Sequence, residues 1–413
     1  MPLEGMPDRQ EEIMQPRAIA ENIYWVGLND RQTELFEGLW PIKQSGVSLN
    51  SYLILDKKNA LIDLSSDLMS ERYIHMLEQL IDLAKIDYIV LNHLEPDHTG
   101  ALLEINRMAP NAIFLGTAKA RDIVANFYDL KEKFRIVADG EEISLGSRTL
   151  KFAAIPFVHW PETMVTYAME DQILFSCDAF GGYGSLPGVI FDDQCPDMPY
   201  MEKEALRYYA NIVAAHSSHT KKAIEKLANV PIKMIAPSHG LIWRKEPGRI
   251  LSLYNKWADY ANGNREKAVT LAFGSMYGNT RQYAEVVMQA VAEQGLSVEV
   301  FDINTVHVSY ILPSMWKNQG IILCAPTYEG SLFPIMSNVM NMAKIKKITN
   351  RTTAYFGSYA WGSMAKKQFE TYCAEQNWTV IENLQFFGKP KEPEFSVIPD
   401  FAKRFAEAVR NAA

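Results

Sequence analysis

Apolar and polar residues alternate in short runs through the first part of the chain. Such runs, broken at Asp, Lys and Gly, are typical of strands with one buried face. We expect strands over residues 22–27, 48–55, 59–63 and 86–91. Residues 69–83 instead carry apolar side chains at the three- and four-residue spacing of a helix. Residues 1 to about 20 are polar, and we expect them to form a loosely held lead-in.

The longest helical pattern covers residues 202–227. It contains His216 and His219, whose separation of three residues also occurs in metal sites. No carboxylate or further ligand accompanies the two histidines, and we therefore interpret them as part of a helix surface.

The pattern changes around residues 262–264, where we place a boundary between a domain over 1–264 and a second over 265–413. In the second domain strands and helices alternate regularly, with helices such as 280–294 and 333–343 between the strands. The expected strands cover residues 268–273, 297–301, 320–324, 352–356 and 378–381. Five strands in this alternation predict a parallel, doubly wound sheet.

Composition narrows the class of protein. The chain has 413 residues, 48% of them hydrophobic and 22% charged, which is typical of a soluble protein with two or three cores. A net charge of -8 argues against a nucleic-acid partner. The four cysteines form no C-x-x-C pair, which argues against a rubredoxin-type or zinc-ribbon module. There is no apolar leader and no run of 18 apolar residues, and we expect a cytoplasmic protein without a membrane partner.

Four potential metal ligands fall within six residues directly after the expected strand at 86–91. They are His93, Glu95, Asp97 and His98. In an extended segment residues i and i+2 point the same way, so His93 and Glu95 can converge on one ion. Asp97 and His98 then turn toward a second position. The alternative, a polar loop in which Asp97 or Thr99 only caps a helix, is disfavoured by four ligand types so close together.

Three more potential ligands each follow an apolar segment, at residues 151–158, 172–177 and 233–238. They are His159, Asp178 and His239. Ligands at the carboxyl ends of successive strands are placed where layered α/β proteins build their sites. Seven oxygen and nitrogen ligands exceed the need of one tetrahedral ion, so we predict two metals, with Asp178 as the bridging carboxylate. The turn-rich segment 181–188 follows Asp178, and we expect it to line the entrance to the site.

The ligand pattern resembles the metallo-β-lactamase fold. Hydrolases of that superfamily usually carry His-x-His-x-Asp-His, and here Glu95 stands in place of the second His. A carboxylate makes the site harder and more anionic, which favours iron over zinc. The pattern therefore indicates redox chemistry rather than zinc-dependent hydrolysis.

A second group of candidate residues lies in the other domain. The loop between its first strand and first helix can bind a phosphate through hydroxyls and free backbone N–H groups: Ser275, Met276, Tyr277, Gly278, Asn279 and Thr280. It has neither G-x-G-x-x-G nor a Walker lysine, so a monophosphate suits it best. Loops after the third and fourth strands offer aromatic faces and backbone donors for a flat ring: Pro326, Thr327, Tyr328, Glu329, Ser358, Tyr359, Ala360, Trp361 and Gly362. Together the three loops predict FMN.

This half of the chain resembles flavodoxin, and the order of the two halves resembles a flavodiiron protein (an A-type flavoprotein) without a rubredoxin tail. The resemblance implies an α/β fold, with an N-terminal metallo-β-lactamase-like αββα sandwich followed by a flavodoxin-like doubly wound parallel sheet. It also implies that His93, Glu95 and His159 bind one iron, that Asp97, His98 and His239 bind the other, and that Asp178 bridges. One departure is Tyr328-Glu329, where many members have an asparagine-rich turn, and it bears on contacts to the flavin edge.

Family membership implies that FMN relays electrons to a diiron site that reduces dioxygen to water, a role in oxygen detoxification. Reduction of nitric oxide to nitrous oxide at the same site is the alternative within the family. Two hypotheses of other classes are a dizinc hydrolase and a gas- or redox-sensing protein without turnover. The resemblance also implies an external electron donor, a rubredoxin-like protein or a reduced deazaflavin, and a head-to-tail homodimer or a dimer of dimers.

Overall fold

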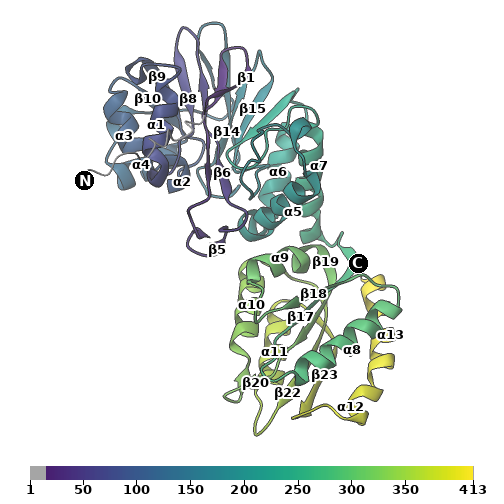
Figure 1. Ribbon diagram of the computed structural model, residues 1–413. Coiled ribbons are helices and arrows are strands. Elements are labelled where there is room, and N and C mark those ends of the chain that lie inside the picture. The colour runs from purple at the N-terminus through teal and green to yellow at the C-terminus, as the bar shows by residue number, and fades with distance from the viewer. Residues whose placement is uncertain (1–14, 413) are drawn as a thin grey trace, which may run out of the picture. The chain divides into compact units, whose positions relative to one another are not determined.

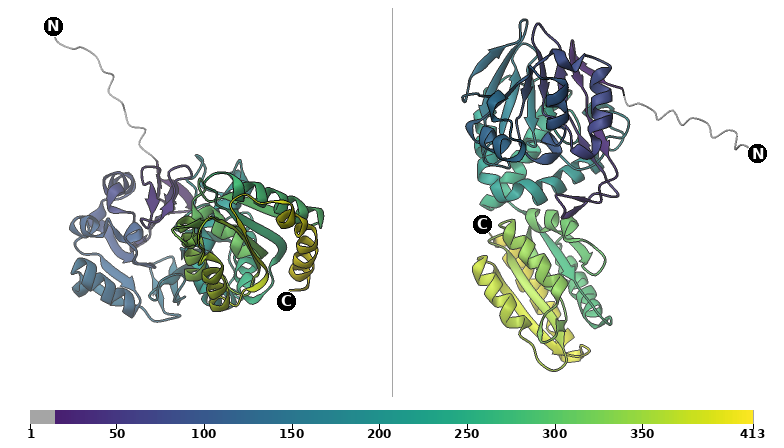
Figure 2. Two further views of the ribbon diagram at one scale, coloured as in Figure 1. Left: turned by 90° about the horizontal axis from the view of Figure 1, so that it is seen from below. Right: turned by 90° about the vertical axis from the view of Figure 1, so that its left-hand side faces the viewer.

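The computed structural model describes residues 15–412, and its ribbon is shown in Figures 1 and 2. It forms two compact units. The first comprises the chain up to Phe36, Ile42–Ala205 and Lys222–Leu251, and the second comprises Glu37–Pro41, Leu206–Lys221 and the chain from Ser252. The predicted boundary at residue 264 stays a prediction. Within residues 15–412, no helix is both long and apolar enough to span a membrane.

The first unit is built on two sheets. The seven-stranded sheet has the order β1 (Arg17–Ala20), β2 (Ile23–Trp25), β7 (Tyr52–Ile54), β8 (Asn59–Ile62), β9 (Ile86–Val90), β10 (Ile113–Gly116) and β11 (Phe134–Ile136). The five-stranded sheet has the order β12 (Glu142–Ser144), β13 (Thr149–Ala154), β14 (Met164–Ala168), β15 (Ile173–Cys177) and β16 (Met234–Pro237). All residues of β14, β15 and β16 are buried, as expected for strands covered on both faces.

Helices cover the outer sides of the two sheets. Figure 1 shows α1 (Ser70–Glu78), α3 (Leu102–Met108) and α4 (Ala118–Tyr128) beside the seven-stranded sheet. The parts of α6 (Ser217–Leu227) and α7 (Pro247–Asp259) that belong to this unit lie beside the five-stranded sheet. The layers are therefore helix, sheet, sheet and helix, and the predicted metallo-β-lactamase-like sandwich is confirmed.

Two predictions for the first strands were wrong. Residues 1–14 lie outside the described residues, but Arg17–Ala20 is no loose lead-in, because it pairs antiparallel with β2. The expected strand 48–55 is divided into β6 (Val47–Leu49), which pairs with β3 (Leu28–Asp30), and β7. The break occurs at Asn50, whose side-chain amide donates instead to the carbonyls of Pro237 (2.9 Å) and Gly240 (3.0 Å).

Two expected helices are shorter than their patterns. The helix expected over 69–83 ends at Glu78, and Asp82 caps a separate short turn, η2 (Leu83–Lys85). The pattern over 202–227 is not one helix. It is divided into α5 (Met198–Tyr208), the π-helical turn η5 (Tyr209–Val213), η6 (Ala214–His216) and α6. A π-turn places one extra residue in the helical ladder, and here it buries all five of its residues.

The second unit contains a five-stranded sheet in the order 2-1-3-4-5, and every neighbouring pair is parallel. Its strands are β18 (Val298–Asp302), β17 (Glu266–Phe273), β19 (Asn318–Cys324), β22 (Thr352–Tyr359) and β23 (Thr379–Phe387). This is the flavodoxin-like order, so the predicted doubly wound parallel sheet is confirmed. In sheets of this order, ligands bind at the switch point, where the strand order reverses between the first and third strands.

Helices pack on both faces of this sheet. In Figure 1, α8 (Asn279–Glu293) and α13 (Ile398–Asn411) lie on one face, and α9 (Val308–Lys317), α10 (Pro334–Ile345) and α11 (Ala365–Glu375) lie on the other. The core beneath α8 and α13 contains Phe356 and Phe401, whose rings meet edge to face with centroids 4.9 Å apart. The remaining elements are β4 (Leu35–Phe36), β5 (Trp40–Pro41), β20 (Thr327–Tyr328), β21 (Ser331–Leu332), η1 (Asp67–Met69), α2 (Pro96–Thr99), η3 (Lys131–Lys133), η4 (Asp192–Gln194), η7 (Tyr260–Asn262) and α12 (Glu392–Ser396).

Candidate metal centre and flavin site

The loop that follows β9 presents four of the predicted ligands. Glu95 has extended backbone angles, and α2 begins directly after it with Pro96 in its first turn. His93 and Glu95 therefore precede the helix, and Asp97 and His98 lie within it. The loop is fixed at its base by Asn92, whose backbone and side-chain nitrogens both donate to the Asp63 carboxylate, at 2.8 and 3.0 Å.

The first group of ligand atoms belongs to His93, Glu95, His159 and Asp178. Oε2 of Glu95 lies 3.3 Å from Nε2 of His93 and 3.1 Å from Nε2 of His159. Oδ2 of Asp178 lies 3.3 Å and 3.2 Å from the same two nitrogens. Four ligand atoms from three separate segments thus converge on one point.

The second group belongs to Asp97, His98 and His239, and it is completed by the other oxygen of Asp178. Nε2 of His98 lies 3.4 Å from Oδ1 of Asp97, and Nε2 of His239 lies 3.2 Å from Oδ2 of Asp97. Oδ1 of Asp178 lies 3.1 Å from the His98 nitrogen and 3.4 Å from the His239 nitrogen. Asp178 therefore turns one oxygen to each group, as a bridging carboxylate does.

The separations between these atoms suit metal ions. Ligands that are about 2.1 Å from a central ion lie roughly 3.0–3.4 Å from one another in octahedral or tetrahedral geometry, and the separations above fall in that range. Within residues 15–412, neither oxygen of Asp97 and neither oxygen of Asp178 accepts a hydrogen bond of normal geometry, although all four are buried. Buried carboxylates without donors are costly, and two divalent cations would neutralise them.

Without metals, the cluster holds protons tightly. Burial by itself lowers the pKa of His159, but contacts with Asp178 and Glu95 outweigh it and raise the pKa to about 9. His239 is likewise buried, and its contacts with Asp178 and Asp97 raise its pKa to about 10. Burial raises the pKa of Asp178, yet the nearby His98 and His93 hold that pKa well below its usual value. The cationic histidines therefore balance the negative charge of the carboxylates.

The ligand loop around His239 is held by residues that sequence patterns did not single out. Nδ1 of His239 lies 2.7 Å from the carbonyl oxygen of Ser48, and the Ser48 hydroxyl accepts a 2.7 Å hydrogen bond from the Gly240 backbone N–H. The backbone N–H of Asn50 donates to the carbonyl of Ser238 at 2.7 Å. These contacts join β6 to the loop after β16, a pairing of segments about 190 residues apart that no local pattern indicates.

His93 also has a partner that the sequence analysis missed. Its Nδ1 atom lies 2.8 Å from Oε1 of Glu162, which is buried. The same oxygen accepts a 3.1 Å hydrogen bond from the backbone N–H of Leu94. Glu162 follows His159, a predicted ligand, by three residues. This proximity was the only feature of the sequence that could have pointed to Glu162.

Aromatic side chains enclose the metal centre. The ring of Trp160 meets the ring of His93 edge to face, with centroids 5.1 Å apart. Phe36 meets His239 in the same way at 5.6 Å and also contacts Tyr183. Gly181 donates its backbone N–H to the carbonyl of Asp178 at 3.1 Å. The first residue of the turn-rich segment 181–188 therefore lies against Asp178.

One placement in the sequence analysis was wrong, although the structure does bring His159 into the first group of ligand atoms. His159 does not directly follow a strand, because β13 ends at Ala154 and four loop residues intervene. The strand ends where its pairing with β14 ends, since Ala154 pairs with Met164. His216 and His219 are half-buried rather than on an exposed helix surface. Among residues 15–412, they belong to no group of three potential ligands.

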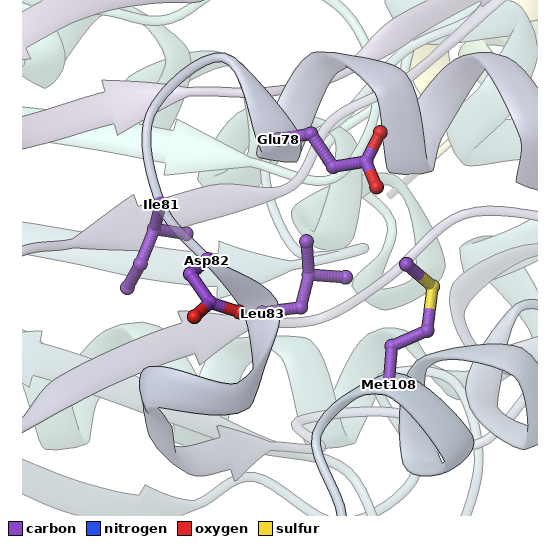
Figure 3. A pocket seen from close by; sticks show the side chains of 5 residues that line it. All are labelled: Glu78, Ile81, Asp82, Leu83 and Met108. Atoms are coloured by element: carbon purple, nitrogen blue, oxygen red, sulfur yellow. The ribbon is translucent and has the colours of Figure 1, made fainter.

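One surface hollow is separate from this centre. Figure 3 shows the side chains around it, Glu78, Ile81, Asp82, Leu83 and Met108, and its volume is about 430 Å³. None of the seven predicted metal ligands lines it. Its two carboxylates, Glu78 and Asp82, belong to no group of three potential metal ligands among residues 15–412.

The predicted phosphate loop lies between β17 and α8. In this loop the Ser275 hydroxyl accepts a 3.0 Å hydrogen bond from the Gly278 backbone N–H. The Ser275 backbone N–H donates to Oδ1 of Asn304 at 2.9 Å. No side chain caps the start of α8, and its first turn contains no acidic residue. Free N–H groups and the positive end of the helix dipole can therefore bind a phosphate. Thr280 is buried and its Oγ1 lies 3.2 Å from Oγ of Ser358.

The two loops predicted to hold a flat ring are brought next to this phosphate loop. Oγ1 of Thr327 donates to the carbonyl of Ser358 at 3.2 Å. Tyr277, Tyr328 and Trp361 are 90%, 48% and 79% exposed, an unusual gathering of uncovered aromatic rings. Such rings can stack on an isoalloxazine ring, so these residues fit FMN.

Both loops differ in detail from the prediction. Tyr328 and Ser331 pair across a hairpin whose turn residues, Glu329 and Gly330, both have positive φ. This is the left-handed conformation that two-residue hairpin turns require, and asparagine or glycine is more usual than glutamate there. In the other loop, Gly357, Ser358 and Tyr359 continue strand β22, since they pair with Gln385, Phe386 and Phe387 of β23. Only Ala360, Trp361 and Gly362 remain outside the strand.

Comparison with known proteins agrees with both halves of the chain. Residues 47–240 match the model of the ODP family beta lactamase, and residues 271–393 match flavodoxin. A nitric oxide reductase from Moorella thermoacetica is 35% identical over 86% of this chain and 89% of its own length.

Solved structures agree over nearly the whole chain. The rubredoxin oxygen:oxidoreductase of Desulfovibrio gigas superposes with a TM-score of 0.91 at 26% identity, over 96% of this chain and 99% of its own. The flavodiiron protein of Giardia intestinalis gives 0.89 at 26%, over 97% and 99%. With the two converging ligand groups in one unit and the flavodoxin-like sheet in the other, the chain belongs to the flavodiiron proteins, a family of oxidoreductases.

Proposed function

We propose that this protein passes electrons from an external donor through FMN to a diiron site that reduces dioxygen to water. The observation that carries the proposal is the pair of ligand groups that share Asp178 and include Glu95. Two metals held by histidine and carboxylate ligands can bind and reduce a diatomic molecule together. Iron rather than zinc suits this donor set, because three carboxylates make it hard and anionic.

We assign the residues of the chain as follows. His93, Glu95 and His159 hold one iron, Asp97, His98 and His239 hold the other, and Asp178 bridges them. The aromatic rings of Phe36 and Trp160 pack against the ligand histidines and restrict the access of water. Ser275 to Thr280 bind the FMN phosphate. Tyr328, Trp361 and the neighbouring loop residues bind its ring.

Nitric oxide is the second candidate substrate. It is favoured by the Moorella thermoacetica relative, which is named a nitric oxide reductase and is 35% identical to this chain. The Desulfovibrio gigas relative is named for oxygen, and both relatives cover nearly the whole chain. Because the chain belongs to a family of oxidoreductases, we set aside the dizinc hydrolase. The same membership accounts for the site without a gas or redox sensor that lacks turnover.

The donor and the assembly are proposals of the same kind. The name of the Desulfovibrio gigas protein includes rubredoxin, and a rubredoxin-like donor is our first choice, with a reduced deazaflavin second. We propose a head-to-tail homodimer, or a dimer of such dimers, in which the flavin of one protomer serves the metals of its partner.

One experiment tests the proposed activity. The purified protein, with its iron and FMN contents measured, is reduced anaerobically and divided into two samples. Dioxygen is added to one and nitric oxide to the other while the flavin spectrum is recorded. Rapid reoxidation with water or nitrous oxide as the product supports the proposal and identifies the preferred gas. Reduced flavin that persists with both gases in a protein containing two irons would overturn it.

A further inference from the structure

The two groups of metal ligands are matched in type. Each has two histidines, one carboxylate of its own and one oxygen of the shared Asp178. By formal charge the two metal positions are therefore equivalent. One histidine of each group, His93 and His239, differs in the atom that contacts its second ring nitrogen. This contact sets how strongly the histidine donates to a metal.

A carboxylate contacts the second ring nitrogen of His93. Oε1 of Glu162 lies 2.8 Å from the Nδ1 atom of His93 and also accepts the Leu94 N–H at 3.1 Å. Oγ1 of Thr163 is the other atom near Nδ1, at 3.5 Å, but it donates to the carbonyl of Trp160 at 2.9 Å. The closest partner of the His93 ring is thus the Glu162 carboxylate.

Among residues 15–412, His93 is the charged partner of Glu162. The side chain is 1% exposed, and within residues 15–412 its Oε2 atom has no hydrogen-bond partner. Its one ion pair in that part of the chain is with His93, and no lysine or arginine contributes. The backbone carbonyl of Glu162 accepts a 3.0 Å hydrogen bond from Thr117, which fixes the segment in place. A fixed, buried negative charge is therefore directed at a single metal ligand.

His239, one of the two histidines of the other group, has a neutral partner in the same position. Nδ1 of His239 lies 2.7 Å from the backbone carbonyl of Ser48. A carbonyl orients the ring as well as a carboxylate does, but it brings no net charge. A histidine that donates to a carboxylate gains anionic character and becomes the stronger ligand.

Asp63 is another buried carboxylate near the ligands, and its contacts differ from those of Glu162. Its two oxygens accept hydrogen bonds from Asn92 rather than from a ligand ring. It interacts electrostatically with both His98 and His93, which belong to different groups, and more strongly with His98. Asp63 therefore acts on both metal positions, whereas Glu162 acts through His93 on one.

We propose that Glu162 is a positioning residue that makes the two metals inequivalent. The ion held by His93, Glu95 and His159 binds more tightly than its neighbour and, when both are iron, is the easier of the two to oxidise. The statement about oxidation rests on the proposed function, and the statement about affinity holds for any divalent metal.

The affinity is tested by titrating the metal-free full-length protein with Co²⁺ alone and following its visible spectrum. Glu162→Gln keeps the side-chain length and an oxygen acceptor but removes the charge. We expect one of the two binding constants to fall roughly 10–100-fold while the other is unchanged. Equal weakening of both constants, or of neither, would overturn the proposal.

The matched control is Glu170→Gln in the same unit. Glu170 accepts a hydrogen bond from the Thr149 N–H, close to the start of β15. Asp178 follows the other end of that strand, so the five-residue strand separates the control from the metals by roughly 16 Å. We expect no change in either constant. A loss equal to that of Glu162→Gln would show that any buried or surface charge has the same effect, and the proposal would fail.

Two further measurements keep the proposal testable in other ways. In the iron-loaded protein, Glu162→Gln should move the reduction potential of the pair to more positive values. An unchanged potential with two irons bound would refute the statement about oxidation. In the zinc-loaded unmodified protein, the Nδ1 proton of His93 should resonate further downfield than that of His239. The reverse order would refute the proposal even if the Gln variant did not fold. Neither the cobalt nor the zinc measurement involves gas turnover, so each can fail independently of the proposed function.

Discussion

Oε2 of Glu95 lies 3.1 Å from Nε2 of His159, although the two residues are 64 positions apart in the chain. Glu95 belongs to the loop after β9 of one sheet, and His159 to the loop after β13 of the other. The contact joins the two sheets at the metal centre, and it is made by the residue that distinguishes this ligand pattern from that of the hydrolases.

Replacing Glu95 by His should restore the hydrolase pattern and shift the preference of the site toward zinc. We expect the variant to retain its fold and its FMN, because the flavin loops belong to the other unit. Turnover of either gas should fall by at least roughly tenfold, since even loss of a residue that supports a ligand has that effect.

Metal content, flavin content and turnover of the Glu95→His variant are measured on one preparation. Glu78→His, at the surface hollow, is the control and should change none of them. Full iron and undiminished turnover in Glu95→His would show that this carboxylate is not a required ligand.

Asp178→Ala should remove an atom from each metal position and release both ions, because no other residue within 15–412 contributes to both groups. Asp178→Asn retains one oxygen and should keep partial occupancy. The measurement is iron per chain after purification. His216→Ala and His219→Ala serve as controls and should keep the iron content of the unmodified protein. Loss of iron in either control would mean that the half-buried histidine pair belongs to a metal site.

The metal-free protein should lose stability as the pH rises from neutral to about 10. In the folded chain the pKa of His159 is raised to about 9 and that of His239 to about 10, above the ordinary value of 6.5. A histidine whose pKa is raised in the folded state stabilises the fold fully below pH 6.5. This stabilisation is lost progressively as the pH rises from 6.5 through the pKa of the folded state. The lowered pKa values of Glu95 and Asp178 act only in acid, so they do not affect this window.

The measurement is thermal unfolding between pH 6 and pH 10, with and without bound metal. The metal-loaded protein should lack the decline, because the ions replace the protons on the histidines. A midpoint that stays level across this range in the metal-free protein would contradict the assigned contacts.

Ser275→Ala and Thr280→Ala should each weaken the retention of FMN without changing the iron content. Each removes a hydroxyl from the phosphate loop, and a hydrogen bond to a charged group contributes about 1.5–3 kcal/mol. Flavin per chain and the dissociation constant of added FMN are the measurements. Thr371→Ala is the matched control, because the Thr371 hydroxyl only bonds to Lys367 within α11. Unchanged FMN binding in the double variant would move the phosphate to another loop.

The seven candidate ligands that the structure brings together could be singled out from the sequence, because their chemistry is carried by residue type and local spacing. His93, Glu95, Asp97 and His98 lie within one loop, and His159, Asp178 and His239 each follow an apolar segment. The parallel sheet of the second half could be predicted for a similar reason, since the alternation of strands and helices leaves few topologies. Local spacing was a poorer guide to element ends, such as those of β13 and β22, because strand pairing with a distant partner decides where a strand stops.

The contacts that orient the ligands could not be predicted in this way. Whether Glu162 or a backbone carbonyl contacts the second nitrogen of a histidine depends on which segments the two sheets bring side by side. Ser48 and His239 are 191 residues apart, and nothing in the residues around either indicates the other. The sequence alone determined which atoms are able to bind metals and a flavin phosphate. The tertiary structure decided which atoms face one another, because hydrogen bonds and metal ligation depend on distances of a few ångströms that only the packed sheets define.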